Sequence, residues 1–245
     1  MQIDLNCDVG EGIGNEASLM PFISSANIAC GFHAGDQHEM QKMVSLCLRY
    51  NVAIGAHPSF PDKANFGRTA MHFSATEIQA IIQNQLNTLN KFINDGGTKM
   101  HHVKLHGALY NMAARDSQLA KTVATAVKDF DSGLIYYGLA GSVMTGEATQ
   151  LGLNVAQEAF ADRSYQADGS LTPRSAPNAL ITDTDQAVRQ VLQIINTNMV
   201  SATNGENIPI RADTICLHGD GPGAMDLAKK INQGLLLAGI EIKRL

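Results

Sequence analysis

Seven strand-like segments recur along the chain, and segments with helical periodicity separate most of them. Strands that alternate with helices pair in parallel, so this pattern predicts an α/β fold. The predicted strands span residues 3–7, 28–32, 52–56, 103–105, 134–137, 155–160 and 214–217. Within the 245 residues we find no Pro- or Ser-rich linker and no internal repeat, and we therefore expect a single domain over residues 1–245.

Residues that favour helix starts precede most of the predicted helices. A helix is expected to begin at or just after each of the following residues: Asp36, Ser74, Asp116, Asp183 and Pro222. A glutamate three residues after Asp36 and after Ser74 completes the pattern of a capping box. The longest polar connections, at residues 160–177 and 201–210, are predicted to be loops.

The predicted strands are polar on one face only. In the first strand, Asp4, Asn6 and Asp8 share a face, while the other face is apolar. The second strand is predicted to place Gly31 and His33 on the corresponding face. An open sheet with helices on both sides would be apolar on both faces. We therefore predict a seven-stranded parallel (β/α) barrel whose partly polar interior can bind a ligand.

Ionisable side chains gather at the predicted C-terminal ends of the strands. They are Asp8, His33, His57, His106, Glu158, His218 and Asp220. The βα loops of a barrel converge at this rim, where active sites form, and histidines with carboxylates supply acid–base catalysis near neutral pH. Lys104 lies on the same face and can stabilise an oxyanion or anchor a carboxylate. It can equally form an ion pair with Asp4 or Asp8.

The same residues can alternatively form a site for a divalent metal ion. An aspartate with two or three histidines can bind such an ion. His33 and His38 form an HxxxxH pair, but the tighter spacing of an HxxEH site is missing. The sequence therefore predicts a polar active site without deciding whether a metal belongs to it.

Two segments are candidates for binding anions. The glycine-rich segment 10–14 follows the first strand but matches neither GxGxxG nor GxxxxGK[ST], so we expect any nucleotide to bind by other means or on another polypeptide. The polar loop 160–177 carries Arg163 and Arg174, which can hold an anionic substrate. Alternatively, these arginines pair with Asp162 and Asp168 in an exposed loop.

Charge and composition argue against several classes of partner. The net charge of −5, the absence of tryptophan and the absence of basic runs disfavour nucleic acid and a membrane surface. The N-terminus lacks a signal-peptide pattern, and no apolar run is long enough to cross a bilayer. The four cysteines contain no CxxC pair, so we expect buried thiols in a cytoplasmic protein.

Six motifs in order along the chain resemble those of the LamB/YcsF family. They are DLNCDVGE (4–11), NIACGFHAGD (27–36), GAHPSF (55–60), KLHGALYN (104–111), EAFADRSY (158–165) and CLHGDG (216–221). The resemblance implies a barrel of the glycoside hydrolase/deacetylase type. It also implies membership of an ATP-dependent 5-oxoprolinase complex that opens 5-oxo-L-proline to L-glutamate, with ADP and phosphate as further products. The implied partners are 5-oxoprolinase subunits B and C.

For this reaction, we expect the rim residues to divide into catalytic and substrate-binding groups. We expect the catalytic groups to be Asp8, His33, His57, Lys104, His106 and His218. We expect the substrate to be bound by Asp4, Asn6, Glu11, Tyr110, Glu158, Arg163, Arg174 and Asp220. Asp8 or His33 would act as the base, and Lys104 with His106 would stabilise charge on the carbonyl or phosphate oxygen. Two alternatives stay open: a metal-dependent amide hydrolase such as a deacetylase, and a non-catalytic, substrate-binding role.

Overall fold

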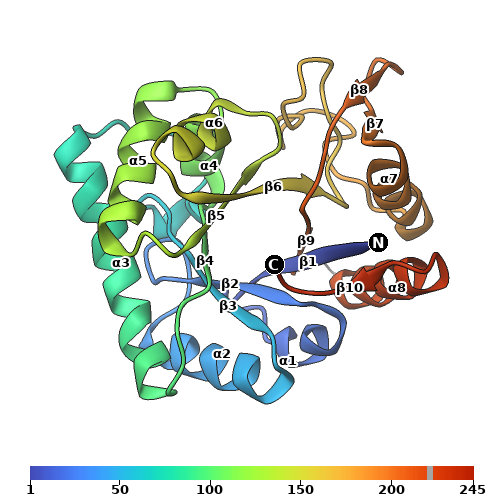
Figure 1. Cartoon of the computed structure of the whole chain (residues 1–245). Helices are drawn as coiled ribbons and strands as arrows, with labels where there is room; N and C mark the ends of the chain where they lie inside the picture. Colours follow the sequence, from blue (N-terminus) through green and yellow to red (C-terminus); the bar gives the residue numbers. More distant parts are fainter. Residues whose placement is uncertain (220–222) are drawn as a thin grey trace.

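Seven parallel strands close into a barrel in the computed structural model, which describes residues 1–219 and 223–245 (Figure 1). In chain order, which is also their order around the barrel, they are β1 (Gln2–Val9), β2 (Ser25–Ala29), β3 (Ala53–His57), β4 (His102–Lys104), β5 (Ile135–Leu139), β6 (Asn154–Phe160) and β9 (Thr214–His218). Pairing of β9 with β1, from Asp4 opposite Thr214 to Asp8 opposite His218, completes the closure. The predicted fold class is confirmed.

Helices surround the barrel (Figure 1). They are α1 (Glu16–Leu19), α2 (Gln37–Tyr50), α3 (Ala75–Asp95), α4 (Gly107–Ala113), α5 (Ser117–Phe130), α6 (Val143–Gln150), α7 (Thr184–Thr197) and α8 (Ala224–Leu237), with short 3-10 turns at Met20–Phe22 and Lys63–Asn65. The capping side chains predicted for α2, α3, α5 and α7 all accept backbone N–H groups, and the capping box at Ser74 is complete. Pro222, predicted to open the last helix, lies outside the described residues.

The second strand was placed too late along the chain. β2 ends at Ala29, and the chain then turns, with the Gly31 N–H bonded to the Ala34 carbonyl. Pairing of Asp8 with Asn27 fixes this register and turns Asn27 into the barrel, where it donates to Asp8. His33 therefore lies in the loop after the strand, and the prediction that it ends the strand is wrong.

Two further segments contain strands that were not predicted from the sequence. Residues 201–210 were predicted to be irregular, but they belong to a hairpin of β7 (Met199–Ser201) and β8 (Asn207–Pro209). Near the C-terminus, β10 (Glu241–Ile242) pairs in parallel with the start of β1, which brings the first and last strands of the chain side by side (Figure 1).

The N-terminal half of the barrel interior is filled by a hydrogen-bonded polar network. Asp4 is fully buried, and its carboxylate accepts hydrogen bonds from Ser24, Ser25, Tyr137 and Thr214 at 2.6–3.0 Å. A buried carboxylate with four donors is satisfied without a ligand. The prediction of a polar barrel interior is confirmed, and this half of it is packed protein.

The environment of the cysteines matches the sequence expectation. Cys7, Cys30, Cys47 and Cys216 are all buried, and none of them forms a disulfide. Among the helices in the described ranges, none combines the length and apolar character needed to cross a membrane.

Gly55 on β3 is predicted to be intolerant of even one added methyl group. A Cβ at this position would lie 2.1 Å from Nε2 of His102, a ring that is held by Asn27 and stacked on Tyr137. We expect Gly55→Ala to lower the free energy of unfolding by about 1–3 kcal/mol or more, as overpacking does. Denaturant unfolding followed by circular dichroism measures this change.

The matched control for this substitution is Gly146→Ala. Gly146 lies inside α6 with nothing within 4 Å of its added Cβ. There the same substitution should stabilise the protein by about 0.5–1 kcal/mol, because alanine favours the helix. Equal effects at the two positions would contradict the proposed contact between β3 and His102.

Candidate active site

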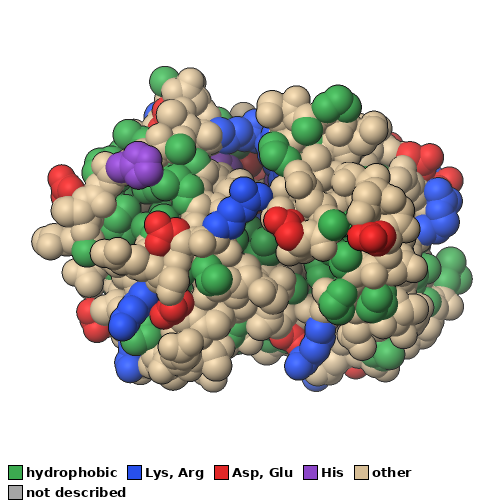
Figure 2. All heavy atoms as spheres, turned by 90° about the horizontal axis from the view of Figure 1, so that it is seen from above, with side chains coloured by type: hydrophobic (Ala, Val, Ile, Leu, Met, Phe, Trp, Pro, Cys, Tyr) green, Lys and Arg blue, Asp and Glu red, His purple; other side chains and the backbone are tan. Residues whose placement is uncertain are grey.

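A cavity of about 430 Å³ lies at the C-terminal ends of the barrel strands. Eight of the residues predicted from sequence line it: Asp8, His57, Lys104, His106, Tyr110, Arg163, Arg174 and His218. Arg68 and Arg115 add to the positive charge around it. In the view from above, Lys and Arg side chains border a hollow near the centre of the molecule (Figure 2). The residue types suit a small anionic ligand.

Lys104 is the central cation of the cavity floor. Its Nζ lies 2.7 Å from Asp8 Oδ1 and 3.1 Å from Glu158 Oε1, and the side chain is 2% exposed. It also donates to Asn6 and to Cys216. Burial alone would lower the pKa of the ammonium, but attraction by the Asp8 carboxylate raises it well above its usual value. The ion pair between Lys104 and Asp8, one of the possibilities that the sequence offered, is present. Glu158 is a second partner of Lys104.

Asp8 connects this lysine to the histidines. It accepts a hydrogen bond from Asn27 Nδ2 at 2.8 Å through Oδ1, the oxygen that faces Lys104. Its other oxygen, Oδ2, lies 3.3 Å from Nε2 of His57. Burial opposes the ionised form, but His57 and Lys104 outweigh it and hold the pKa of the Asp8 carboxyl well below its usual value. Asp8 is therefore an anion that faces the cavity between Lys104 and His57.

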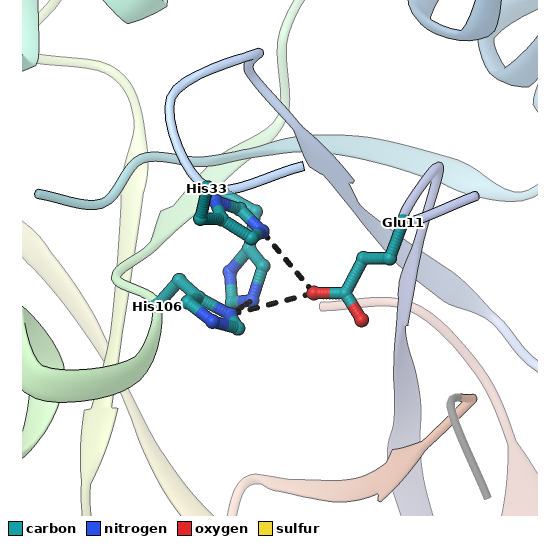
Figure 3. A group of neighbouring side chains, drawn as sticks. Glu11, His33 and His106 are labelled. Carbon is teal, nitrogen blue, oxygen red and sulfur yellow. Dashed lines mark hydrogen bonds and ion pairs between the residues drawn. The ribbon is translucent and has the colours of Figure 1, made fainter. Parts of the chain in front are cut away.

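Glu11, His33, His57 and His106 form a compact cluster beside Asp8. One donor atom from each of the four lies within 4.8 Å of the others. Glu11 Oε1 is 3.2 Å from His33 Nε2 and 3.4 Å from His106 Nδ1, as drawn in Figure 3. Glu11 reaches the cluster from the glycine-rich segment after β1. Imidazole nitrogens and a carboxylate in this arrangement can hold a divalent metal ion.

Two of these histidines are kept neutral by their surroundings. The rings of His33 and His106 stack in parallel with their centroids 3.8 Å apart. Burial, reinforced by His57, lowers the pKa of His33 to about 2. Burial also holds the pKa of His106 well below its ordinary value, with His33 contributing. Neutral imidazole is the form that binds metals and accepts protons.

A second carboxylate–histidine pair involves the last barrel strand. His218 Nδ1 is 2.9 Å from the Asp162 carboxylate, and the His218 ring stacks on Phe160. Burial opposes ionisation of Asp162, but His218 lowers its pKa below the usual value. Sequence reasoning considered Asp162 only as a partner of the arginines, so the pair with His218 was missed.

The loop arginines have different roles. Arg163 is buried and donates to the carbonyl oxygens of Ala179 and Thr172, so it fixes the loop that covers the cavity. Arg174 is exposed at the cavity mouth. Asp168 accepts a hydrogen bond from the Ser170 backbone within the loop. Arg174 is thus the better placed of the two arginines to meet a ligand.

The remaining predicted residues lie deeper or elsewhere. Asn6 donates to Glu158 and to Thr214 below the cavity, and the Tyr110 hydroxyl donates to Glu158 at 2.7 Å. Asp4 belongs to the network that fills the other half of the barrel. His38, paired with His33 by sequence spacing, is exposed on α2 and is not part of the cluster. Asp220 lies outside the described residues.

Comparison with known proteins gives consistent results. The model of the LamB/YcsF family matches residues 3–245. The chain is 50% identical to the A subunit of a 5-oxoprolinase from Tolumonas auensis, over 99% of this chain and 98% of that protein. It superposes on the crystal structure of a lactam utilization protein from Thermus thermophilus with a TM-score of 0.94 and 41% identity, over the whole of both chains. A family 4 carbohydrate esterase from Streptomyces lividans shares only the fold, with a TM-score of 0.51 and 13% identity over 98% of this chain and 91% of the esterase.

Proposed function

This chain belongs to the LamB/YcsF family, and we propose on that basis that it is the A subunit of an ATP-dependent 5-oxoprolinase. The proposed reaction opens the lactam of 5-oxo-L-proline to L-glutamate, coupled to hydrolysis of ATP to ADP and phosphate. Support comes from full-length relatives of that name and from a closely superposed lactam utilization protein. The single structural observation that carries the proposal is Asp8, which faces the cavity between Lys104 and His57.

The chemistry of a lactam explains why these groups are needed. A five-membered lactam is an unreactive amide, and phosphorylation of its carbonyl oxygen makes the ring carbon electrophilic. Asp8, held as an anion, can take a proton directly from the attacking water, and the ring nitrogen takes up a proton as the C–N bond breaks and phosphate leaves. Lys104 and His106 line the same cavity and can stabilise negative charge that develops on the carbonyl or phosphate oxygen.

We propose that ATP binds to a partner subunit. The sequence has no P-loop motif, and the glycine-rich segment after β1 delivers Glu11 into the histidine cluster. We therefore assign nucleotide binding to other polypeptides of the complex, proposed to be 5-oxoprolinase subunits B and C. On this assignment the isolated chain has little or no turnover.

Reconstitution tests the function directly. The chain is mixed with purified subunits B and C, 5-oxoproline and ATP, and glutamate and phosphate are measured together. We expect equal amounts of both products from the complete mixture and neither product when the chain is omitted. Full activity without this chain would overturn the proposal.

Arg174 provides a test of how the cavity recognises its substrate. A charge-assisted hydrogen bond to the carboxylate of 5-oxoproline is worth about 1.5–3 kcal/mol. We therefore expect Arg174→Ala to raise KM for 5-oxoproline by about tenfold or more, with a smaller effect on kcat. Arg211→Ala is the control, because Arg211 is 76% exposed and pairs with Asp213 away from the cavity. An unchanged KM in Arg174→Ala would exclude the contact.

A further inference from the structure

We propose that Glu11, His33, His57 and His106 bind one divalent transition-metal ion of the zinc class at the cavity wall. The existence of this site does not depend on the proposed 5-oxoprolinase reaction. Only the use that catalysis makes of the ion rests on that function. The argument combines the spacing of the donors, the direction of their protons and the chemistry of the ligand set.

Three of the spacings between the donor atoms are close to those of a tetrahedral centre. For metal–nitrogen bonds of about 2.0–2.1 Å, neighbouring ligands of a tetrahedron lie about 3.3 Å apart. Glu11 Oε1 lies 3.2 Å from His33 Nε2 and 3.4 Å from His106 Nδ1. His106 Nδ1 lies 2.9 Å from His57 Nε2, and all four donor atoms lie within 4.8 Å of one another. One ion can therefore contact all four with small adjustments.

Hydrogen bonds on the outer side of two rings fix where their protons lie. His57 Nδ1 is 2.8 Å from the carbonyl oxygen of Lys104, and His106 Nε2 is 2.9 Å from that of Phe66. A carbonyl only accepts, so each of these nitrogens carries the proton. When both rings are neutral, their inner nitrogens, 2.9 Å apart, both present lone pairs. Two facing lone pairs repel, and a cation between them converts this repulsion into two bonds.

His33 also has its outer ring nitrogen bonded to a neighbour, in this case a serine hydroxyl. Its Nδ1 lies 3.0 Å from Ser59 Oγ, and that hydroxyl is placed to donate to the carbonyl of Phe60 at 2.9 Å. Ser59 Oγ therefore accepts from His33, which leaves Nε2 without a proton and directed at Glu11. Gly67 (φ +66°) packs against His33 and the His106 ring, since a Cβ there would lie 2.8 Å from His33 Cβ and 2.9 Å from His106 Cδ2. Each of the three rings thus has an outer contact that directs its donor nitrogen inward, as metal-binding histidines do.

The donor set indicates the class of ion. Three imidazole nitrogens and one carboxylate suit Zn²⁺, Co²⁺, Ni²⁺ or Fe²⁺, whereas Mg²⁺ takes oxygen ligands. A proton on His57 Nε2 could also relieve its contact with Asp8 Oδ2 at 3.3 Å. That alternative involves only His57 and Asp8. The metal accounts for all four.

The position of the cluster connects it to the reaction. His57 and His106 line the cavity beside Asp8, so an ion held by them is within reach of a bound ligand. When bound, such an ion would polarise the lactam carbonyl or lower the pKa of an attacking water. The ion would lie beside the ion pair of Lys104 and Asp8, because Asp8 also contacts His57.

Metal binding is tested on the full-length chain prepared without a histidine tag. The protein is stripped with a chelator, titrated with Zn²⁺ and with Co²⁺, and analysed by elemental mass spectrometry after removal of free metal. We expect one ion per chain and intense Co²⁺ absorption bands in the visible region, as tetrahedral Co²⁺ produces. Both readouts are independent of 5-oxoproline turnover.

Variants separate this site from adventitious binding. His57→Gln and His106→Gln should lose the stoichiometric ion and the visible bands, and Ser59→Ala should weaken affinity about 10–100-fold by releasing His33. His38→Ala and His72→Ala, which replace exposed histidines outside the cluster, should still bind one ion per chain. Circular dichroism checks that each variant is folded. Substoichiometric metal in the wild-type chain, or equal binding by folded His57→Gln, would overturn the proposal.

Discussion

Replacing Lys104 with methionine is expected to lower the free energy of unfolding by about 3–5 kcal/mol. Methionine fills a similar volume but removes the cation that lies 2.7 Å from Asp8 and 3.1 Å from Glu158. The two carboxylates would then be buried without their partner, which is far more costly than the loss of an exposed ion pair. Denaturant unfolding monitored by circular dichroism gives the change.

The same substitution at Lys230 serves as the control. Lys230 pairs with Asp185 at 2.8 Å, but its side chain is 48% exposed and that of Asp185 is 70% exposed. Surface pairs of this kind contribute little to stability, so Lys230→Met should leave the unfolding midpoint unchanged. If Lys104→Met were also as stable as the wild type, Lys104 could not be the cation that compensates both carboxylates.

Asp8→Asn should reduce turnover of the reconstituted complex by about 10²–10⁴-fold. Asparagine has the same shape and can still accept a hydrogen bond from Lys104, but it cannot take up a proton. It also removes the negative charge that lies 3.3 Å from His57 Nε2. The rate of glutamate formation at saturating 5-oxoproline and ATP measures the effect on kcat.

Asp36→Asn distinguishes this loss from a general effect of the substitution. Asp36 caps α2 from an exposed position, and asparagine caps helices about as well as aspartate. We expect Asp36→Asn to retain full turnover. Near-wild-type turnover in Asp8→Asn would remove Asp8 from the catalytic groups, even if the chain proves to be part of the enzyme.

Local sequence patterns predicted the barrel because each pattern has a local physical cause. The alternation of Asp4, Asn6 and Asp8 with apolar neighbours reports directly that β1 has a polar side and an apolar side. Capping residues such as Ser74 bond only to the next turn of chain, so they too can be recognised without knowledge of the fold. β2 was misplaced because its apolar run continues to Phe32, whereas its pairing with β1 ends at Ile28 and its pairing with β3 ends at Ala29.

The candidate site was predicted less completely because it depends on contacts between distant segments. Rim position identified His57, His106 and Asp8, since each lies at or just after a strand end. The pairing of His218 with Asp162 could not be deduced, because the partners are 56 residues apart and come from different strands and loops. The sequence also did not predict that the Asn27 side chain points into the barrel. Its direction depends on the register of β2, which no local pattern determines.

The polar network around Asp4 has a consequence for how molecules move through the barrel. Among the described residues, the buried side chains of Ser25, Tyr137 and Thr214 bond to Asp4 in the N-terminal half of the interior and separate that end from Asp8. On the proposed function, lactam would therefore enter and amino acid would leave by the C-terminal rim, where the cavity lies. A partner that delivers a phosphoryl group to this cavity would have to bind at the same rim. Product could then leave only when that partner does not cover the rim.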